Sequence, residues 1–382
     1  MTGDPIISRQ IKVLGTQNQD DFVYNSPPFS RHRIDRRRYV PLGRIYKPMD
    51  GAKVMTPWPL GGADLVHAWR RIPLGPTPFV VGFDWHLPLT WEHSTQSFAM
   101  LMDALLSPKC RRIVASSQAA ASAMLHRHEK HPRHGELQTK TVVRLPGIDI
   151  PDTQDWFDPN KKIDELRLVF VGDHFARKGG CVAVKLAEKA LAAGVPLHIT
   201  IVSSQTCGVW TDPTRPGFFD PYLKLCSLPN VTLIPSLPKA ETLDLIGHSH
   251  LTLMPSFGDT LEYTVMEGMA RHTPAIVTAT CSFPEFIDAD SGVLLPLETT
   301  CQGEWKHIGD PGRDKPEFEA LFANTVDRLA EQTLAVCADL IANPARLGEL
   351  RKGARRMAET KLNAKDASRF WDELYVEALS RR

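Results

Sequence analysis

The sequence predicts an α/β protein with two domains, each built on a parallel sheet. The chain has 382 residues, which at about 100–200 residues per domain corresponds to two or three domains. Short apolar runs alternate with segments of helical period, a pattern typical of parallel sheets covered by helices. Residues 150–165 interrupt the alternation with turn-forming residues and no period, which indicates a linker.

The first domain begins with a region that is difficult to assign. Residues 1–60 are mostly loop-like and rich in Pro, Arg and Asp, with one candidate strand at Ile11–Leu14. Beyond them the pattern becomes regular. It predicts strands at residues 64–68, 78–83, 112–115 and 141–145, and helices at residues 95–106 and 118–126.

The second domain shows the clearer alternation. It predicts strands at residues 166–171, 197–202, 231–234, 251–254 and 275–278, and helices at residues 181–193, 240–248 and 261–271. From Pro316 onward the chain is helical, with a break near Asn343-Pro344. We therefore expect a first domain at residues 1–155, a second at 156–355, and a final helix at 356–382 that packs back toward the first. Because ligands bind outside the carboxyl ends of strands in open α/β sheets, we expect both domains to face a central cleft.

Composition excludes several classes of protein. Hydrophobic residues make up 42% of the chain and the formal net charge is +1, which argues against general disorder and against nucleic-acid binding by the whole protein. The seven Cys are widely spaced without a C-x-x-C motif, so neither a disulfide framework nor a structural zinc site is expected. The sequence contains no long apolar run and no signal-peptide pattern, so we expect a cytoplasmic protein.

A first candidate binding segment follows the strand at 166–171. A short loop carries Arg177 and Lys178, and Gly179-Gly180 precede the helix. Backbone N–H groups at a helix N-terminus favour anions, adjacent cations strengthen that preference, and glycine allows a phosphate to approach the backbone. The alternative is a solvated basic loop. The segment is not the G-x-x-x-x-G-K-[ST] loop of an ATPase.

A second candidate segment follows the strand at 251–254. We expect a helix to start near Thr260, with Asp259 as its N-cap, and Glu267 lies eight residues further, a little over two turns. The two carboxylates would then lie on one side of the helix. Alternatively, Asp259 is a simple cap and Glu267 a solvated residue, although the apolar neighbours of Glu267 favour partial burial and a partner.

These segments occur in the order and spacing of one enzyme family. Phe-Val-Gly is followed by Lys178-Gly179, and Leu-Met-Pro-Ser is followed by Asp259 and Glu267-Gly-Met-Ala; Thr-Pro-Ala-Ile-Val and Ser-Gly-Val-Leu-Leu come next. In this order they resemble the retaining, GT-B-fold glycosyltransferases of family 4 (glycosyl transferases group 1). The resemblance covers roughly residues 165–382 and is looser in the first half. It implies two Rossmann-like α/β domains facing a central cleft.

The resemblance also implies roles for residues that would bind a donor. Lys178 would neutralise the donor diphosphate, and Glu267 would bind the ribose hydroxyls. Asp259 stands where the family usually has the Glu that contacts the donor sugar. Backbone N–H groups at Thr260 and Leu261 would meet the phosphate.

The sequence departs from the family pattern at two positions of this site. Asp173 stands where many members have a phosphate-binding Arg, and Arg177, next to Lys178 and Gly179, would supply that cation instead. Glu262 replaces a common Gly, which would alter the sugar that fits.

In the first domain the candidate catalytic residues are Asp84 and His86, just after a strand. The family often places a His near the donor sugar there; Asp84 falls at the aligned position and His86 two residues later, so both remain candidates. A structural loop His is the alternative. His67 ends a strand and is expected to be structural.

Three weaker patterns each have a simple structural explanation as an alternative. His126, His128, His131 and His134 lack the spacing of known metal sites, so a solvated helix end is expected there. The Arg31–Arg38 run suits anionic lipid headgroups or a phosphate-bearing acceptor, and equally an exposed basic loop. Four tryptophans suit sugar stacking, although core packing is the default; they are Trp58, Trp69, Trp85 and Trp91.

We therefore expect a glycosyltransferase that moves a sugar from a nucleotide diphosphate sugar to a glycan or glycolipid acceptor. The resemblance implies retention of anomeric configuration and no metal or other cofactor, and no Asp-x-Asp cation motif stands out. The protein would be cytoplasmic, with at most a peripheral membrane contact through Arg31–Arg38. The alternatives are a catalytically silent nucleotide-sugar-binding partner and a GT-B sugar-nucleotide epimerase or hydrolase.

Overall fold

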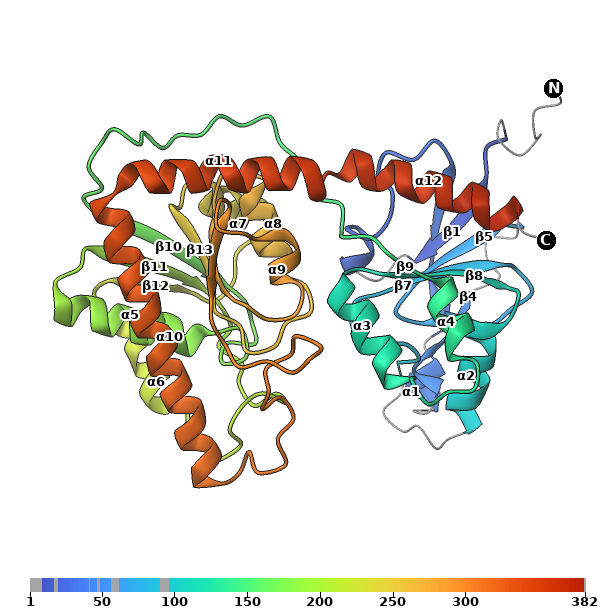
Figure 1. The fold of residues 1–382 in the computed structure, drawn as a ribbon, viewed down its shortest axis with the longest axis horizontal. Helices are drawn as coiled ribbons and strands as arrows, with labels where there is room; N and C mark the ends of the chain where they lie inside the picture. The colour runs from blue at the N-terminus through green and yellow to red at the C-terminus, as the bar shows by residue number, and fades with distance from the viewer. Residues whose placement is uncertain are drawn as a thin grey trace. The chain divides into compact units, whose positions relative to one another are not determined.

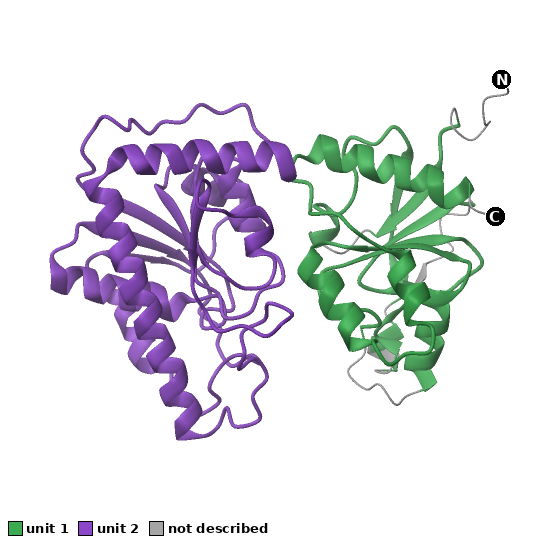
Figure 2. Ribbon diagram, viewed as in Figure 1, with its two compact units in different colours: residues 1–148, 362–382 green, residues 149–361 purple. Residues whose placement is uncertain are grey.

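The chain divides into two compact units, each a parallel sheet between helices (Figures 1 and 2). The computed structural model describes residues 9–16, 20–40, 42–46, 49–55, 62–89 and 96–380. Unit 1 comprises residues 1–148 and 362–382, and unit 2 comprises residues 149–361. Both boundaries differ from those expected at 155/156 and 355/356.

Unit 1 contains a six-stranded parallel sheet in the order β2-β1-β5-β7-β8-β9. The strands are β1 (Lys12–Thr16), β2 (Arg33–Arg37), β5 (Leu65–Trp69), β7 (Phe79–Phe83), β8 (Cys110–Ala115) and β9 (Thr141–Val143). Unit 1 also contains a three-stranded sheet of β3 (Tyr39–Val40), β4 (Ala52–Met55) and β6 (Ile72–Pro73). Short helix α1 (Leu42–Ile45) precedes β4.

Neighbouring residues of each central strand enter two different cores, because side chains alternate across a strand. Val13, Leu65 and Val80 pack with the last helix, α12 (Ala364–Ser380). Their chain neighbours Leu14, Val66 and Val81 pack in the other core. The helices contributing to that core are α2 (Gln96–Leu106), α3 (Gln118–Arg127) and α4 (His134–Lys140). A sheet buried on both faces explains the near-continuous apolar runs of the sequence.

One expectation for unit 1 is wrong. The Arg31–Arg38 run is not a loop, because Arg33–Arg37 forms edge strand β2. The Asp372 carboxylate of α12 accepts a hydrogen bond from the Arg31 backbone N–H at 2.9 Å. Arg33 pairs with Asp35 and Arg37 is buried, so only part of the run is exposed.

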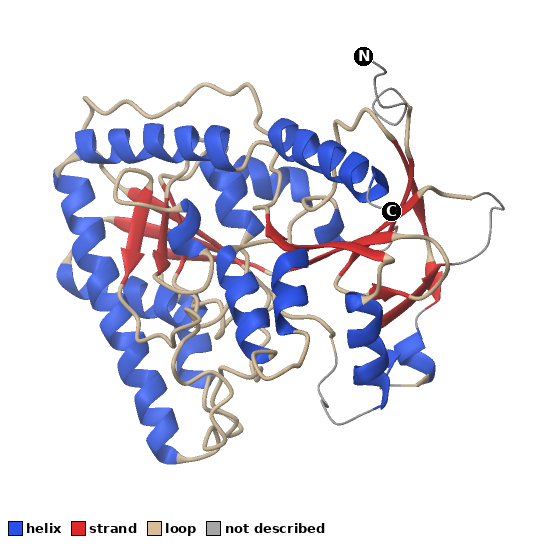
Figure 3. Ribbon diagram, turned by 45° about the vertical axis from the view of Figure 1, so that its right-hand side comes forward, coloured by secondary structure: helices blue, strands red, loops and turns tan. Residues whose placement is uncertain are grey.

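Unit 2 contains a second six-stranded parallel sheet in the order β12-β11-β10-β13-β14-β15. Figure 3 shows its strands as a central layer between helices. The strands are β10 (Leu166–Val171), β11 (Leu197–Val202), β12 (Val231–Ile234), β13 (Leu251–Met254), β14 (Ala275–Thr278) and β15 (Gly292–Leu295). The helices are α5 (Gly180–Ala193), α6 (Asp220–Lys224), α7 (Lys239–Gly247), α8 (Tyr263–Met269), α9 (Phe283–Phe286), α10 (Pro316–Ala342) and α11 (Pro344–Lys361).

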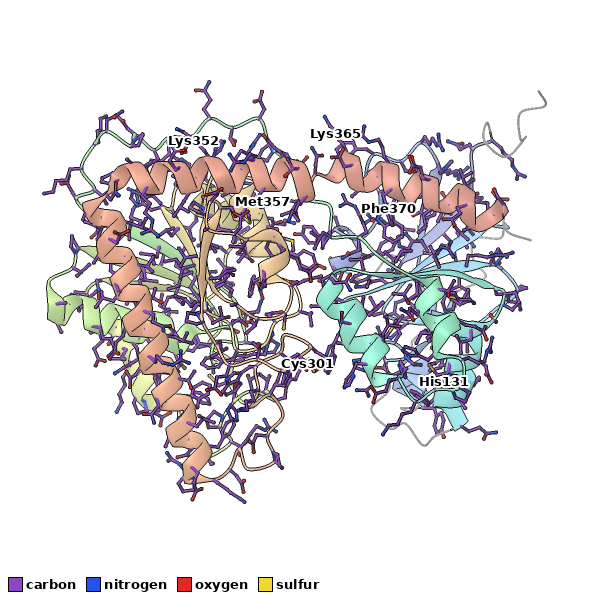
Figure 4. All side chains as sticks on the ribbon, in the orientation of Figure 1. His131, Cys301, Lys352, Met357, Lys365 and Phe370 are labelled. Carbon is purple, nitrogen blue, oxygen red and sulfur yellow. The ribbon has the colours of Figure 1, made fainter. Side chains whose placement is uncertain are left out.

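The predicted linker is hydrogen-bonded onto unit 2. Asp155 pairs with Arg351 of α11, whose Nη2 lies 2.7 Å from Asp155 Oδ1. Arg355 Nη1 donates to the carbonyl of Pro151 at 2.8 Å. These contacts explain why unit 2 begins at residue 149. Figure 4 labels Lys352 and Met357 on α11, and Lys365 and Phe370 on α12.

Within the described residues, the structure contains no helix that is both long enough and apolar enough to cross a membrane.

Candidate functional site

Two loops meet at the carboxyl ends of neighbouring strands in unit 2. β10 pairs with β13, so the chain leaves both strands at the same edge of the sheet. The carbonyl of Arg177 in the first loop accepts a hydrogen bond from the backbone N–H of Phe257 in the second at 2.8 Å. Arg177 Nη1 donates in turn to the carbonyl of Gly258 at 2.6 Å. These bonds hold the two loops together.

Glycine is required where the first loop turns into α5. Gly179 has a φ of 93°, in the left-handed region, and a Cβ there would lie 2.4 Å from the carbonyl oxygen of Pro255. At the end of β10, a Cβ on Gly172 would meet Cδ of Lys178 at 2.4 Å. Gly172 thus leaves room for the Lys178 side chain against the strand end.

Four charged side chains gather where the loops meet; we call Arg177, Lys178, Asp259 and Glu262 the charged cluster. Arg177 Nη1 lies 2.9 Å from Asp259 Oδ2, and Lys178 Nζ lies 3.3 Å from the same oxygen. Lys178 Nζ also forms an ion pair with Glu262 Oε1. The four side chains are between 3% and 17% exposed, so these contacts form largely away from water.

Burial and mutual charge separate the pKa values of the two acids. Burial alone would raise the pKa of Asp259, but Lys178 and Arg177 outweigh it and lower that pKa to about 2. Burial and the nearby Asp259 charge raise the pKa of Glu262 well above its usual value, despite Lys178. Burial would lower the pKa of Lys178, but Glu262 and Asp259 together raise it above the ordinary value. Asp259 therefore ionises at a much lower pH than Glu262.

A loop after β11 lies beside the charged cluster. Trp210 in this loop is 40% exposed, and its ring centroid lies 5.6 Å from Cζ of Arg177, a cation–π distance. The buried Asp212 carboxylate accepts hydrogen bonds from the backbone N–H groups of Gly208 and Val209 at 2.7 and 3.1 Å. The loop is thus ordered by Asp212 and presents an aromatic face next to a cation.

The structure brings together only some of the predicted donor-binding residues. Arg177, Lys178, Gly179 and Asp259 meet as expected. Asp173 instead faces the loop after β11, where the Ser204 hydroxyl donates to its carboxylate at 2.9 Å. Hydrogen bonds from the Ser204 hydroxyl and backbone N–H lower the pKa of Asp173.

Glu267 lies apart from the charged cluster, on α8. Its Oε1 lies 3.1 Å from Lys239 Nζ on α7. The expectation of partial burial with a partner fits its 12% side-chain exposure. The Glu267 carboxylate is therefore paired with Lys239 rather than with a residue of the charged cluster.

The predicted capping of α8 by Asp259 is wrong. The helix starts at Tyr263, and Glu262 occupies the N-cap position without a side-chain cap hydrogen bond. Asp259 precedes the helix because its carboxylate is held by Arg177 and Lys178. Thr260 and Leu261 also precede it, and the Thr260 carbonyl accepts a hydrogen bond from the Ser282 hydroxyl at 2.6 Å.

Sequence reasoning missed two features of this site. It noted Glu262 only as a replacement for glycine, and it did not predict the contact with Lys178. It did not consider Trp210 at all. For Glu262, the available signal in the sequence was an acidic residue three positions after Asp259. The second depends on how a long loop folds, which no local pattern reveals.

In unit 1, Asp84 is an ion-pair partner at the end of β7. Arg70 Nε donates to Asp84 Oδ1 at 2.7 Å, and Arg70 Nη2 lies 2.9 Å from Asp21 Oδ2. Arg70 has a φ of 58°, in the left-handed region, at the end of the adjacent strand β5. His86 is 5% exposed, and its ring packs edge-on against Trp85 at 4.3 Å. Both candidates thus lie at the carboxyl edge of the sheet.

His67 lies inside unit 1, as expected for a structural residue. Its Nδ1 lies 2.7 Å from the Tyr375 hydroxyl, and its ring centroid lies 4.1 Å from that of Trp371 on α12. Trp69 is 1% exposed and is core, whereas Trp85 is half-buried. Trp58 and Trp91 lie outside the described residues.

The histidines of α3 and of the turn between α3 and α4 make separate contacts. His128 Nε2 lies 2.7 Å from the Leu87 carbonyl, and His126 faces Glu129. His131 lies in the turn between the two helices (Figure 4), where its Nδ1 accepts from the Arg133 N–H. No group of three or more His, Cys, Asp or Glu side chains suited to hold a metal occurs in the described part of the chain.

Comparisons with known proteins agree on the fold and on part of the sequence. Residues 165–302 match the family model described as Glycosyl transferases group 1. A D-inositol 3-phosphate glycosyltransferase of Thermobifida fusca (strain YX) is 23% identical over 270 residues, which are 62% of this chain. The match spans 59% of that relative's length.

Solved structures extend the likeness to nearly the whole chain. Anabaena Alr3699/HepE in complex with UDP and glucose has a TM-score of 0.56 at 12% identity, over 95% of this chain and 99% of that one. A glycosyltransferase from Rickettsia africae ESF-5 has a TM-score of 0.55 at 16% identity, over 84% and 78%. The two parallel-sheet units and these neighbours confirm the predicted GT-B fold.

Proposed function

We propose that the protein is a glycosyltransferase that takes its sugar from a nucleotide diphosphate donor, and that unit 2 binds this donor. The observation that carries the proposal is the charged cluster. It places two buried cations at the carboxyl ends of β10 and β13, inside the segment that matches the group 1 family model. Lys178 and Arg177 would hold the diphosphate, and Glu267 on α8 would bind the ribose.

The proposed chemistry follows from where charge develops. Breaking a sugar–diphosphate bond builds negative charge on the leaving group and positive character on the anomeric carbon. Cations fixed at the leaving phosphate stabilise that charge more in the transition state than in the ground state. Because Lys178 and Arg177 supply this charge, we propose a reaction without a metal ion. Retention of configuration is proposed from the family resemblance, with Asp259 beside the donor sugar.

The acceptor is proposed to bind at the carboxyl edge of the unit 1 sheet, near Asp84 and His86. A glycan or glycolipid acceptor is supported by the family resemblance. The Thermobifida relative is named a D-inositol 3-phosphate glycosyltransferase. A peripheral contact with the inner face of a membrane is proposed through the exposed side chains of Arg31, Arg33 and Arg36.

The test of donor use is a panel of nucleotide sugars with the full chain. We expect one donor to release its nucleoside diphosphate when a suitable acceptor is added. Thermal shifts measure binding in the same samples, because a ligand that binds the folded state raises the melting temperature. If no donor binds and no donor releases its nucleotide, the proposal is contradicted.

A second candidate function is a nucleotide-sugar-binding protein without catalysis. It is favoured by the ion pairs of both proposed catalytic regions, since Lys178 is held by two acids and Asp84 by Arg70. Thermal stabilisation by a donor, with no nucleotide release for any acceptor, would identify this function.

A further inference from the structure

Each cation of the charged cluster already has a carboxylate partner within the protein. Asp259 Oδ2 contacts Arg177 Nη1 at 2.9 Å and Lys178 Nζ at 3.3 Å. Glu262 Oε1 forms a second ion pair with Lys178 Nζ. A diphosphate that reaches Lys178 must therefore compete with Glu262 for the same ammonium group.

Glu262 is buried between two groups of the cluster, with a hydrogen bond to the Asp259 carboxylate and an ion pair with Lys178. It is 2% exposed, and glutamate is almost never fully buried unless it is paired. It occupies the N-cap position of α8 but forms no side-chain cap hydrogen bond. The carboxyl group is thus directed to Lys178 and Asp259 rather than to the helix.

The charge of the cluster depends on one proton. With Asp259 and Glu262 both ionised, two negative charges offset Arg177 and Lys178, and the four groups are neutral together. With Glu262 protonated, one positive charge remains. Since a diphosphate is attracted by net positive charge and repelled by a carboxylate at short range, its affinity should follow the protonation of Glu262.

Other titratable groups lie around the charged cluster. Burial, Arg177 and Lys178 lower the pKa of His174, so this imidazole is neutral there. Burial raises the pKa of the Cys281 thiol, beside Asp259, to about 12. Burial raises the pKa of Asp212 in the loop after β11, although three hydrogen bonds to its carboxylate and the Arg177 charge oppose this shift. The negative charge of Glu304 also raises the pKa of the Cys281 thiol. Burial and the Asp259 charge raise the pKa of Glu262 itself well above its usual value.

We propose that Glu262 controls donor binding at Lys178 through its protonation state: the diphosphate of a nucleotide sugar binds while Glu262 is protonated and is opposed when Glu262 ionises. The inference rests on the proposed function, because it takes the donor diphosphate as the anion that Lys178 binds. It goes further by assigning a binding role to Glu262, one of the two residues that depart from the family pattern.

The test is calorimetric binding of UDP-glucose, UDP-N-acetylglucosamine and GDP-mannose to the full chain. The diphosphate diesters of these probes keep a constant charge near neutral pH. For a probe that binds, we expect wild-type affinity to fall at least tenfold as the pH rises across the range in which the protein stays folded. Glu262→Gln should bind equally at both ends of this range, and as tightly as wild type does at the lower end.

A matched control is Glu319→Gln, on α10 of the same unit. Glu319 is 13% exposed and pairs with Arg215 Nε at 2.6 Å, outside the charged cluster. We expect this variant to keep the wild-type pH dependence. Glu262→Gly serves as a second variant, since its backbone φ of −118° suits any residue. Both variants are first checked for folding by their melting temperatures.

The outcomes separate the inference from the proposed function. Binding with the same pH dependence in wild type, Glu262→Gln and Glu262→Gly overturns the role of Glu262 and leaves donor binding intact. Binding by none of the probes at any pH, to wild type or to the variants, overturns the proposed donor site itself.

Discussion

Strand β13 carries a buried ion-pair cluster at each end, and the two differ in what surrounds them. At its carboxyl end lies the charged cluster. At its amino end Arg351, which is fully buried, pairs with Asp155 and donates to the carbonyl of Ser249 at 3.0 Å. We call Asp155, Trp156, His250 and Arg351 the amino-end cluster.

In the amino-end cluster, Arg351 packs against the ring of Trp156, which is itself 39% exposed. The Trp156 ring centroid lies 4.9 Å from Cζ of Arg351, and also 4.9 Å from Cζ of Arg167. The Trp156 indole N–H donates to the Gly247 carbonyl at 2.6 Å. The carboxyl-end loops instead leave Asp173 and His174 exposed. Burial and ion pairing thus do not distinguish a binding site from a structural contact; the end of the strand at which the cluster lies does.

Replacement of Arg351 by Met should have the largest effect. The substitution leaves the Asp155 carboxylate and two carbonyls without their donor, and loss of one partner of a buried ion pair costs about 3 kcal/mol or more. Denaturant unfolding should show this loss with donor affinity unchanged at temperatures where the variant is folded. Arg356→Met on the same helix is the control, since Arg356 is 66% exposed. Equal stability of the two variants would contradict a structural role for the amino-end cluster.

The second largest effect should be a change of the unfolding free energy with pH. Burial, Arg167 and Arg351 lower the pKa of His250 from 6.5 to about 4, and neutral Nδ1 accepts from the Arg167 N–H at 2.9 Å. Below pH 6.5 the unfolded chain therefore binds a proton that the folded chain does not. The unfolding free energy should fall by about 2 kcal/mol between neutral pH and about pH 5.

His250→Asn sharpens this prediction, because its side-chain oxygen replaces the acceptor without titrating. Stability measured across the same pH range should lose most of its slope in this variant. An unchanged slope would mean that other groups control the acid sensitivity of unit 2.

At the other end of β13, Lys178→Ala should reduce turnover at least tenfold, or about 1.4 kcal/mol, because the leaving diphosphate loses a fixed cation. Steady-state kinetics with the donor found by the panel measures this. Lys189→Ala on α5 is the control, since Lys189 pairs with Glu331 on α10. Wild-type turnover in Lys178→Ala would contradict the phosphate assignment.

The smallest effect is expected for Glu267→Gln. Removal of the carboxylate charge should weaken donor binding by several-fold, in line with about 1 kcal/mol for one hydrogen bond, with little change in the rate constant of the bound complex. Calorimetric titration gives the affinity. Identical affinities would contradict a ribose contact, and a much larger effect would place Glu267 closer to the reaction than its pairing with Lys239 indicates.

The sequence was most informative where structure depends on local pattern. The bounds predicted for β10, β11 and β13 agree with the structure, because each is a short apolar run between turn-forming residues. Strand β2 was missed, since an edge strand can be charged and Arg33–Arg37 lacks an apolar run.

The site was predicted in part for the same reason. Loop residues Arg177 and Lys178 were found next to their strand. The start of α8 was misplaced because Asp259 has the composition of an N-cap, whereas its carboxylate bonds to cations 81 or more positions away along the chain. The contact between Lys178 and Glu262 likewise joins two loops, and local spacing cannot reveal which residues of neighbouring strands meet.

The packing of α12 against β1 has a consequence for biosynthesis. Trp371 and Tyr375 fill the same core as Ile11 and Val13, although all of unit 2 lies between them in the sequence. A ribosome delivers residues in order, so unit 2 has emerged completely before the last helix of unit 1 is made. The nascent first sheet therefore waits with one apolar face uncovered, and a chaperone that shields apolar surface would find it there during translation.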